Sequence, residues 1–226
     1  MSVGVSLGDV RQRMASAAGR VGRNVEDVEL VVIGKGQPVS VLQQAFDAGQ
    51  RIFGENRGQE LASKVGRLPG EVRWHFVGPL QTNKVRLVRP RVELLQSFDR
   101  DRLIKPWLRG DDRAPPALLQ VNIGMEAQKH GVPPDLVLQT FDRWESAGIR
   151  LNGIMAIPPL GRTPEASRPY FARMRDIADR LSVRLGRDLA LSMGMTDDFE
   201  VAIEEGSTMV RVGRAIFGRR PTVGWT

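Results

Sequence analysis

The sequence predicts an α/β protein of the (β/α)8-barrel (TIM-barrel) class. Eight short apolar runs alternate with helical patterns along the 226 residues, which is typical of parallel βαβ units. Eight such units in a chain of this length suit a closed barrel slightly below the usual size. The alternative is an open doubly wound sheet, but "GKGQPV" has valine where the dinucleotide motif needs its last glycine. It also lacks the Ser or Thr that follows the lysine of a P-loop.

The expected elements follow one another in regular order. An extra N-terminal amphipathic helix is expected over about residues 6–21. Strands are expected near 28–33, 51–53, 72–77, 92–97, 117–123, 150–157, 189–193 and 208–212, and helices over 39–48, 134–147, 165–186 and 197–206. Gly49 and Gly148 are predicted to end two of these helices. The stretch 108–117 is expected to be a surface loop, so we predict a single domain over 1–226 without a second β-rich domain.

The composition excludes several classes of site. The absence of cysteine excludes disulfides, thiol nucleophiles and thiolate metal sites, and with only two histidines no metal site is predicted. No stretch approaches the roughly 20 apolar residues of a membrane-spanning helix, and the N-terminus lacks a signal-peptide core, so a cytoplasmic protein is expected. The net charge is +7, but the basic residues are spread along the chain. A nucleic-acid-binding face is therefore not predicted.

Several unusual residues are predicted to lie at or after the ends of strands, or within the third strand for His75, in the region where barrel enzymes carry their functional groups. They are Lys35, Asn56, His75, Asn122, Met155, Ser192, Met193, Arg211 and Gly213. Taken alone, Lys35 is compatible with a solvated lysine at a strand end. In a barrel mouth, a partly desolvated amine can instead become nucleophilic and form a Schiff base with a carbonyl compound.

Two kinds of Schiff-base site are open at this point, an aldolase site and a pyridoxal-phosphate site. Both need a phosphate pocket. The stretch "STMVRVGRAIFG", residues 207–218, predicts a strand, a glycine and a short helix, as at the phosphate site after strands 7 and 8 of many barrels. The backbone amides of Gly213 and Arg214 would face the anion there.

Long motifs resemble those of a known family. They are "VVIGKGQPVS", "AFDAGQRIFGENRGQE", "WHFVGPLQTNKVR", "LLQVNIGMEAQKHGV", "GIMAIPP" and "LSMGMTDDFEVAIEEGSTMVRVGRAIFG", in the family's order over residues 30 to 218. The sequence is similar to YggS/PROSC-type pyridoxal-phosphate homeostasis proteins, which are related to the N-terminal barrel of alanine racemase, of PLP fold type III.

The resemblance implies a role for each matching residue. Pyridoxal 5′-phosphate (PLP) would be held as a Schiff base on Lys35, with Arg211 facing the pyridine nitrogen. Ser192 and the amides of Gly213 and Arg214 would hold the phosphate. Asn56, His75 and Met193 would line the ring, and Lys129 matches a second lysine linked to PLP handling.

The resemblance also implies a function, a monomeric PLP carrier in intracellular PLP homeostasis with no established catalytic residue. PLP-dependent apoenzymes would receive the cofactor, and no membrane or nucleic-acid partner is expected. The alternative is a weak amino-acid racemase, although racemisation in related enzymes uses a tyrosine from a second domain and the only tyrosine here, Tyr170, falls in a predicted helix. A third possibility is a scaffold or nucleic-acid-associated barrel whose PLP site has decayed.

The chain departs from the family pattern at two places. Around Lys35 the family pattern V-S-K-x-K-P is replaced, with Gly34 before the lysine and Gly36 and Gln37 after it. After Gly213, Arg214 and Ala215 stand where family members often carry serine or threonine. The first change removes a cation and frees the backbone, and the second removes a hydroxyl from the expected phosphate site.

Overall fold

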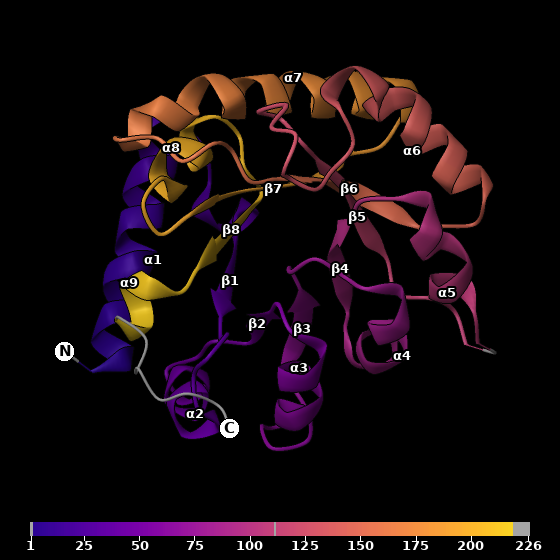
Figure 1. The fold of residues 1–226 in the computed structure, drawn as a ribbon. Helices are drawn as coiled ribbons and strands as arrows, with labels where there is room; N and C mark the ends of the chain where they lie inside the picture. The colour runs from indigo at the N-terminus through magenta and orange to yellow at the C-terminus, as the bar shows by residue number, and fades with distance from the viewer. Residues whose placement is uncertain (1, 111, 219–226) are drawn as a thin grey trace.

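The protein folds into a closed barrel of eight parallel strands, arranged in chain order with β8 beside β1 (Figure 1). The structure is a computed structural model that describes residues 2–110 and 112–218. The strands are β1 (Glu29–Ile33), β2 (Ile52–Glu55), β3 (Arg73–Phe76), β4 (Leu94–Phe98), β5 (Ala117–Val121), β6 (Leu151–Ala156), β7 (Ala190–Met195) and β8 (Met209–Val212). The predicted fold class is thus confirmed.

Helices follow the strands and cover the outside of the barrel. The α-helices are α1 (Val3–Arg20), α2 (Val39–Asp47), α3 (Gly58–Lys64), α4 (Val85–Val88), α5 (Ile104–Leu108), α6 (Val137–Ser146), α7 (Arg168–Leu185), α8 (Phe199–Glu204) and α9 (Arg214–Phe217). Short 3₁₀ helices are η1 (Val25–Asp27), η2 (Thr82–Lys84), η3 (Arg89–Arg91), η4 (Asp101–Leu103), η5 (Pro134–Leu136) and η6 (Pro164–Ser167). No helix of the described residues is long and apolar enough to cross a membrane.

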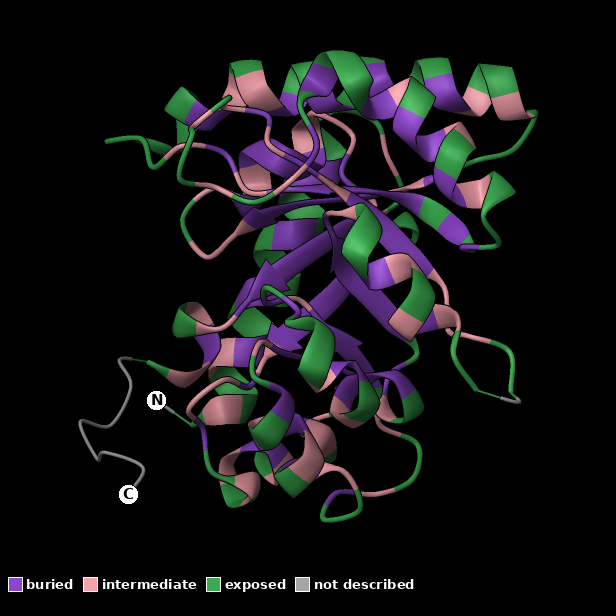
Figure 2. Ribbon diagram, turned by 45° about the vertical axis from the view of Figure 1, so that its right-hand side comes forward, coloured by how far each residue is buried: buried purple, intermediate pink, exposed green. Residues whose placement is uncertain are grey.

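The strands are buried on both faces, as the purple strands of Figure 2 show. Successive side chains of a strand point to opposite faces, so each strand contributes to two cores. A small apolar cluster fills the barrel interior, with Val31, Ile52, Leu94, Leu118, Met155 and Met209. A much larger cluster fills the layer between strands and helices. The continuous apolar runs of the sequence follow from this double burial.

The N-terminal helix α1 packs where the barrel closes, against α8, α9 and α2 (Figure 1). Its apolar stripe is fully covered by these neighbours and includes Leu7, Val10 and Met14. On its polar side, Arg13 and Arg20 pair with carboxylates of α8. The helix is therefore an integral part of the outer layer.

Most sequence expectations agree with the structure within a few residues. Gly49 and Gly148 have positive φ and directly follow the C-cap residues of α2 and α6, so they end these helices as predicted. The short helices α3, α4 and α5 were not predicted individually, because four to seven residues are too few to show a helical period. Of the domain predicted over 1–226, residues 1, 111 and 219–226 lie outside the described residues.

Candidate functional site

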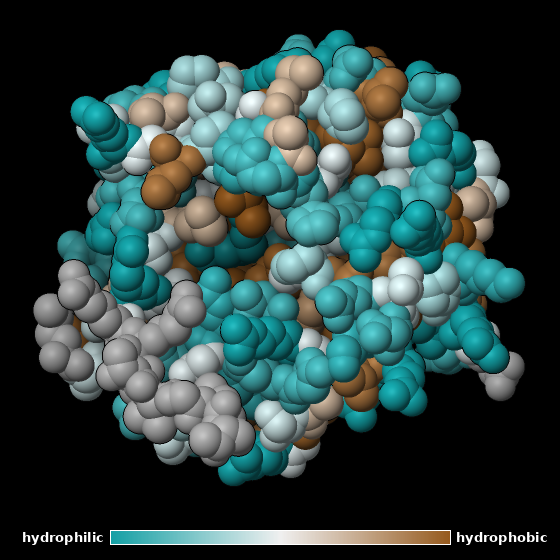
Figure 3. Space-filling model, viewed as in Figure 1, coloured by the Kyte–Doolittle hydropathy of each residue, from teal (hydrophilic) through white to brown (hydrophobic). Residues whose placement is uncertain are grey.

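A cavity of about 550 Å³ opens at the carboxyl ends of β1, β7 and β8. It is lined by Ile33, Lys35, Gln37, Met195, Thr196, Asp197, Arg211, Gly213, Arg214, Phe217 and Gly218. Figure 3 shows a hollow in the face of the molecule seen in Figure 1, with hydrophobic side chains inside it and mostly hydrophilic side chains around it. Four of the predicted site residues therefore share one cavity, namely Lys35, Arg211, Gly213 and Arg214.

Lys35 lies in a tight turn between β1 and α2 that the flanking glycines make possible. The amide of Gln37 donates to the carbonyl of Gly34 at 3.0 Å, which closes the turn. Gly36 has φ of +71°, a conformation that L side chains rarely adopt. A Cβ atom on Gly34 would lie 3.1 Å from Leu42 and 3.3 Å from Glu55 Oε1. The departures around Lys35 thus have a conformational and packing reason.

Both glycines of this turn are held by charged side chains from outside it. Lys64 Nζ, in α3, donates to the carbonyl of Gly34 at 2.8 Å. The amide of Gly36 donates to Glu60 Oε2 at 2.8 Å. The backbone on each side of Lys35 is consequently tied to helix α3, which limits the positions that the Lys35 backbone can take.

Lys64 is itself a buried cation, with a residue exposure of 1%. Lys64 pairs with Glu55, which is fully buried at the end of β2. The Lys64 ammonium also lies 3.3 Å from Glu60 Oε2. Burial raises the pKa of the Glu55 carboxyl, and the Lys64 ammonium opposes that rise. We take Glu55 as ionised, because its oxygen accepts directly from the lysine. A buried charge of this kind is tolerated only when it is paired and hydrogen-bonded.

Arg211, from β8, places a second buried cation at the floor of the cavity. Its guanidinium donates to the Ala156 carbonyl at 2.9 Å and to the Ser192 hydroxyl. Burial lowers the pKa of Arg211 to about 10, with partial compensation from Asp198. Arg211 therefore stays protonated at neutral pH. Among the described residues, no carboxylate lies within ion-pair distance of it, so its charge faces the cavity with neutral acceptors behind it.

A chain of hydrogen bonds runs from Arg211 into the barrel interior. Because a guanidinium can only donate, the Ser192 hydroxyl accepts from Arg211 and donates to Gln96 Oε1 at 2.8 Å. Gln96 Nε2 then lies 3.0 Å from His75 Nδ1. His75 must accept this hydrogen bond, which assigns its proton to Nε2. Burial lowers the pKa of His75 to about 4, so the ring is neutral.

Four predicted ligand residues lie away from the cavity lining. Ser192 and His75 are buried beneath Arg211 and support it. Met193 was predicted to line the ring, but it points to the opposite side of β7 from Ser192 and belongs to the core between strands and helices. Asn56 lines a different cavity, formed by the loops after β2 and β3.

Lys129 also lies outside the cavity lining, in the loop after β5. Its ammonium donates to the Pro158 carbonyl at 3.1 Å and pairs with Glu126. In this position it connects two loops of the barrel mouth.

The sequence reasoning missed several residues of the site. Thr196 and Asp197 line the cavity directly after β7, and their place after a strand was an available signal. Gln96 and Lys64 act from the barrel interior and from α3. Lys64 is one of only five lysines in the chain, but nothing in its local sequence shows that it is buried.

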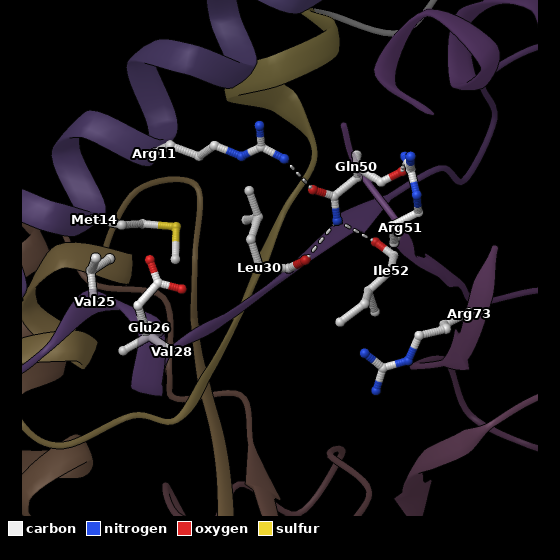
Figure 4. A pocket seen from close by; sticks show the side chains of 10 residues that line it. All are labelled: Arg11, Met14, Val25, Glu26, Val28, Leu30, Gln50, Arg51, Ile52 and Arg73. Carbon is white, nitrogen blue, oxygen red and sulfur yellow. Dashed lines mark hydrogen bonds between the residues drawn. The ribbon is translucent and has the colours of Figure 1, made fainter. Parts of the chain in front are cut away.

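Another cavity, of about 330 Å³, lies at the opposite ends of the strands (Figure 4). Several of its polar groups are already engaged in hydrogen bonds and ion pairs. Gln50 donates to the carbonyls of Leu30 and Ile52 and accepts from Arg11, as the dashed lines show, while Arg73 pairs with glutamates. Barrels of this type carry their chemistry at the carboxyl ends of the strands. We therefore assign this cavity a structural role.

Comparisons with known proteins find similar chains over nearly the whole length of this one. The family of alanine racemase N-terminal domains matches residues 6–221. The pyridoxal phosphate homeostasis protein of Aquifex aeolicus is 38% identical over 95% of this chain and 96% of its own length. That of Escherichia coli strain K12 is 37% identical, with 95% of each chain covered.

Several solved structures share the fold of this chain. PipY of Synechococcus elongatus, solved with PLP bound, has a TM-score of 0.76 and 30% identity, covering 92% of this chain and all of its own. A structure described as an unknown protein from Bifidobacterium adolescentis has a TM-score of 0.89 and 30% identity, covering 95% of this chain and 94% of its own. A lysine/ornithine decarboxylase of Vibrio vulnificus, at 15% identity and a TM-score of 0.66, shares the fold alone.

Replacing Lys64 with methionine should strongly destabilise the protein. The change preserves the apolar stem but leaves Glu55 and Glu60 without their cation, at a cost of about 3–5 kcal/mol in the free energy of unfolding. Urea denaturation at pH 7 measures the loss. The matched control is Lys105→Met, on an exposed turn of α5. If Lys64→Met unfolds at the same urea concentration as the wild type, the buried pair does not have the role assigned here.

His75 should make the protein less stable in mild acid. Its pKa is lower in the folded state than the usual 6.5, so the unfolded chain binds the proton more readily between about pH 6.5 and 4. The stabilisation is present above pH 6.5 and is lost as the pH falls through 4. From pH 7 to 5 the free energy of unfolding should lose about 2 kcal/mol through this residue.

The His75 contribution is measured by urea denaturation of the wild type and of His75→Gln at both pH values. The variant should lose about 2 kcal/mol less than the wild type over this interval. Equal losses in the wild type and His75→Gln would contradict a neutral buried His75.

Proposed function

Because this chain belongs to the pyridoxal phosphate homeostasis proteins of the alanine racemase N-terminal domain family, we propose that it binds PLP in the cavity beside Lys35. In this proposal the protein acts in PLP homeostasis as a carrier that holds and delivers the cofactor. The observation that carries the proposal is the meeting of the Lys35 turn, buried Arg211 and the Gly213–Arg214 turn at one cavity.

The residues present fit PLP. The cavity, at about 550 Å³, falls within the usual range for a small-molecule site. PLP supplies an aldehyde that reacts with a lysine amine to form a Schiff base, and Lys35 is the lysine in the cavity lining. Arg211 would lie against the pyridine nitrogen. Since Arg211 stays charged at neutral pH, it would disfavour protonation of that nitrogen and weaken the ring as an electron sink. This supports carriage over transamination.

We propose that the hydroxyl of Thr196 and the backbone amides of Gly213 and Arg214 bind the phosphate of PLP. The hydroxyl of Ser192, expected there from the resemblance, is engaged by Arg211 and Gln96. Thr196 instead lines the cavity itself, as Gly213 does. Arg214 pairs with Asp197 at the rim, with both side chains exposed. A phosphate would compete with Asp197 for this guanidinium, which makes up for the hydroxyl missing after Gly213.

The racemase alternative has less support from the site. Racemisation needs a second acid–base group on the face of the cofactor opposite the lysine. The described lining residues include no tyrosine, histidine or cysteine. Tyr170 lies in α7, partly buried against the core outside the barrel. We further propose a cytoplasmic monomer that passes PLP to PLP-dependent apoenzymes. The relatives' names support only the role in PLP homeostasis.

Reduction with borohydride in the presence of PLP should label Lys35. We expect an absorbance band of the lysine–PLP adduct in the wild type, and a single modified peptide that contains Lys35. Lys35→Ala should lose the band, and Lys105→Ala, which changes an exposed lysine, should retain it. A wild type without the band, or a label that persists in Lys35→Ala on another lysine, would contradict the proposal.

Thr196→Val should weaken binding of PLP but not of pyridoxal, which lacks the phosphate. A hydrogen bond to a charged group contributes about 1.5–3 kcal/mol, so PLP should bind about tenfold or more weakly. Ser192→Ala should weaken both ligands alike, because Ser192 acts through Arg211. Absorbance titration measures the affinity of each of the two variants, and of the wild type, for PLP and for pyridoxal. An equal effect of Thr196→Val on PLP and pyridoxal would contradict a phosphate contact.

A further inference from the structure

We propose that a second cavity in the barrel mouth binds the phosphate monoester of a small molecule, separately from the PLP cavity. This cavity, about 330 Å³ in volume, lies between the loops that follow β2, β3, β4 and β5. It is lined by Asn56, Arg57, Gly58, Gln59, Phe76, Pro79, Leu80, Gln81, Lys84, Arg100 and His130. None of the residues lining the PLP cavity belongs to it.

The charges of this lining all have one sign. Arg57, Lys84, Arg100 and the titratable His130 come from four different loops, and no aspartate or glutamate lines the cavity. Positive charges that line one cavity repel one another, and a bound anion would offset this repulsion. The lining therefore indicates an anionic ligand.

Carboxylates behind the lining compensate only part of this charge. Asp99, buried beneath the cavity, is shared between Arg100 and His130, which lies 3.1 Å from it. Arg57 lies 3.7 Å from Glu60 Oε1, while the other oxygen of Glu60 is engaged with Lys64 and Gly36. Among the described residues, no carboxylate lies within ion-pair distance of Lys84. A dianionic phosphate would supply the missing charge and match the fork of an arginine.

The site is preorganised. The Arg100 guanidinium is held by the Leu80 carbonyl at 2.6 Å and by Asp99. Gly78 packs directly on Asn56, because a Cβ atom at Gly78 would lie 2.3 Å from the Asn56 carbonyl oxygen. These contacts fix one cation and the backbone of Asn56, whose side-chain Oδ1 atom is buried. A ligand would therefore find both already in position.

Asn56 gives a second indication of a ligand. Its Oδ1 atom is buried and has no hydrogen-bond partner, and an unpaired buried acceptor is unfavourable. It requires a donor, which the surrounding cations do not provide. Beside it, Phe76, Pro79 and Leu80 form an apolar wall. The ligand class that satisfies all of these groups is a phosphate monoester with a short carbon skeleton and an N–H or O–H donor.

Calorimetric titration with phosphoethanolamine tests this assignment. The protein is first loaded with PLP and reduced with borohydride, so that the first cavity cannot accept the probe. We expect saturable binding by this protein and binding at least tenfold weaker in the double variant Arg57→Gln/Lys84→Met. Arg57 is exposed and Lys84 is partly exposed, and a thermal melt checks that the variant is folded. Lys105→Met, a matched loss of one exposed lysine, should bind like the wild type.

The ligand class is tested with β-alanine, which keeps the ammonium and the spacer but carries a carboxylate. It should bind more weakly than phosphoethanolamine. Absence of saturable binding by the wild type, equal affinity in the double variant, or tighter binding of β-alanine would each overturn the assignment.

The titration is repeated on Lys35→Ala without PLP, so failure of the PLP site and failure of this site are distinguished. Loss of affinity in Arg57→Gln/Lys84→Met on this background supports the second site whatever the outcome at Lys35. The double variant should also form the Lys35 adduct as the wild type does.

Discussion

The buried ammonium of Lys64 is the constraint on which the geometry around Lys35 depends. Because a charge removed from water must be paired, Lys64 holds the end of β2 through Glu55, the turn after β1 through the Gly34 carbonyl, and Glu60 within α3. Glu60 in turn holds the amide of Gly36. One cation in α3 thus joins this helix to the end of β2 and to the turn after β1, and the turn that carries Lys35 has little freedom to move.

Arg211 is a buried cation of the opposite kind. Lys64 is compensated by two carboxylates and contributes structure, whereas Arg211 is held by a hydroxyl and a carbonyl, which are neutral acceptors. Its charge is therefore available to a ligand in the cavity. The hydrogen bonds through Ser192 and Gln96 to His75 also require a neutral histidine, so the interior adds no competing charge beneath the site. Lys64 therefore supports the structure of the barrel mouth, whereas Arg211 is placed to interact with a ligand.

The fold could be predicted from the sequence because strands buried on both faces leave continuous apolar runs, and because glycines such as Gly49 end helices at recognisable places. The position of Lys35, Arg211 and Gly213 followed from the rule that barrels place their chemistry after the strands. The facing of Met193 did not follow, since a strand buried on both sides gives no alternation to show which residues point inward. The roles of Lys64 and Gln96 depend on contacts across 30 and 96 residues of sequence, which no local pattern reveals.

The structure gives a physical reason for three residues that depart from the family pattern, namely Gly34, Gly36 and Arg214. Gly36 adopts a left-handed conformation, and a Cβ atom on Gly34 would lie in tight contact with the side chains of Leu42 and Glu55. Arg214, in the place of a hydroxyl, pairs with Asp197 at the rim of the cavity. The turn around Lys35 is consequently well suited to present a lysine, although its sequence differs from the usual motif.

The most direct test of this account is a crystal structure of the protein with PLP. We expect electron density continuous from Lys35 Nζ to the cofactor, with the pyridine nitrogen within hydrogen-bond distance of the Arg211 guanidinium and the phosphate at Thr196 and Gly213. Cofactor density on a different lysine, or a ring whose nitrogen faces away from Arg211, would contradict the account.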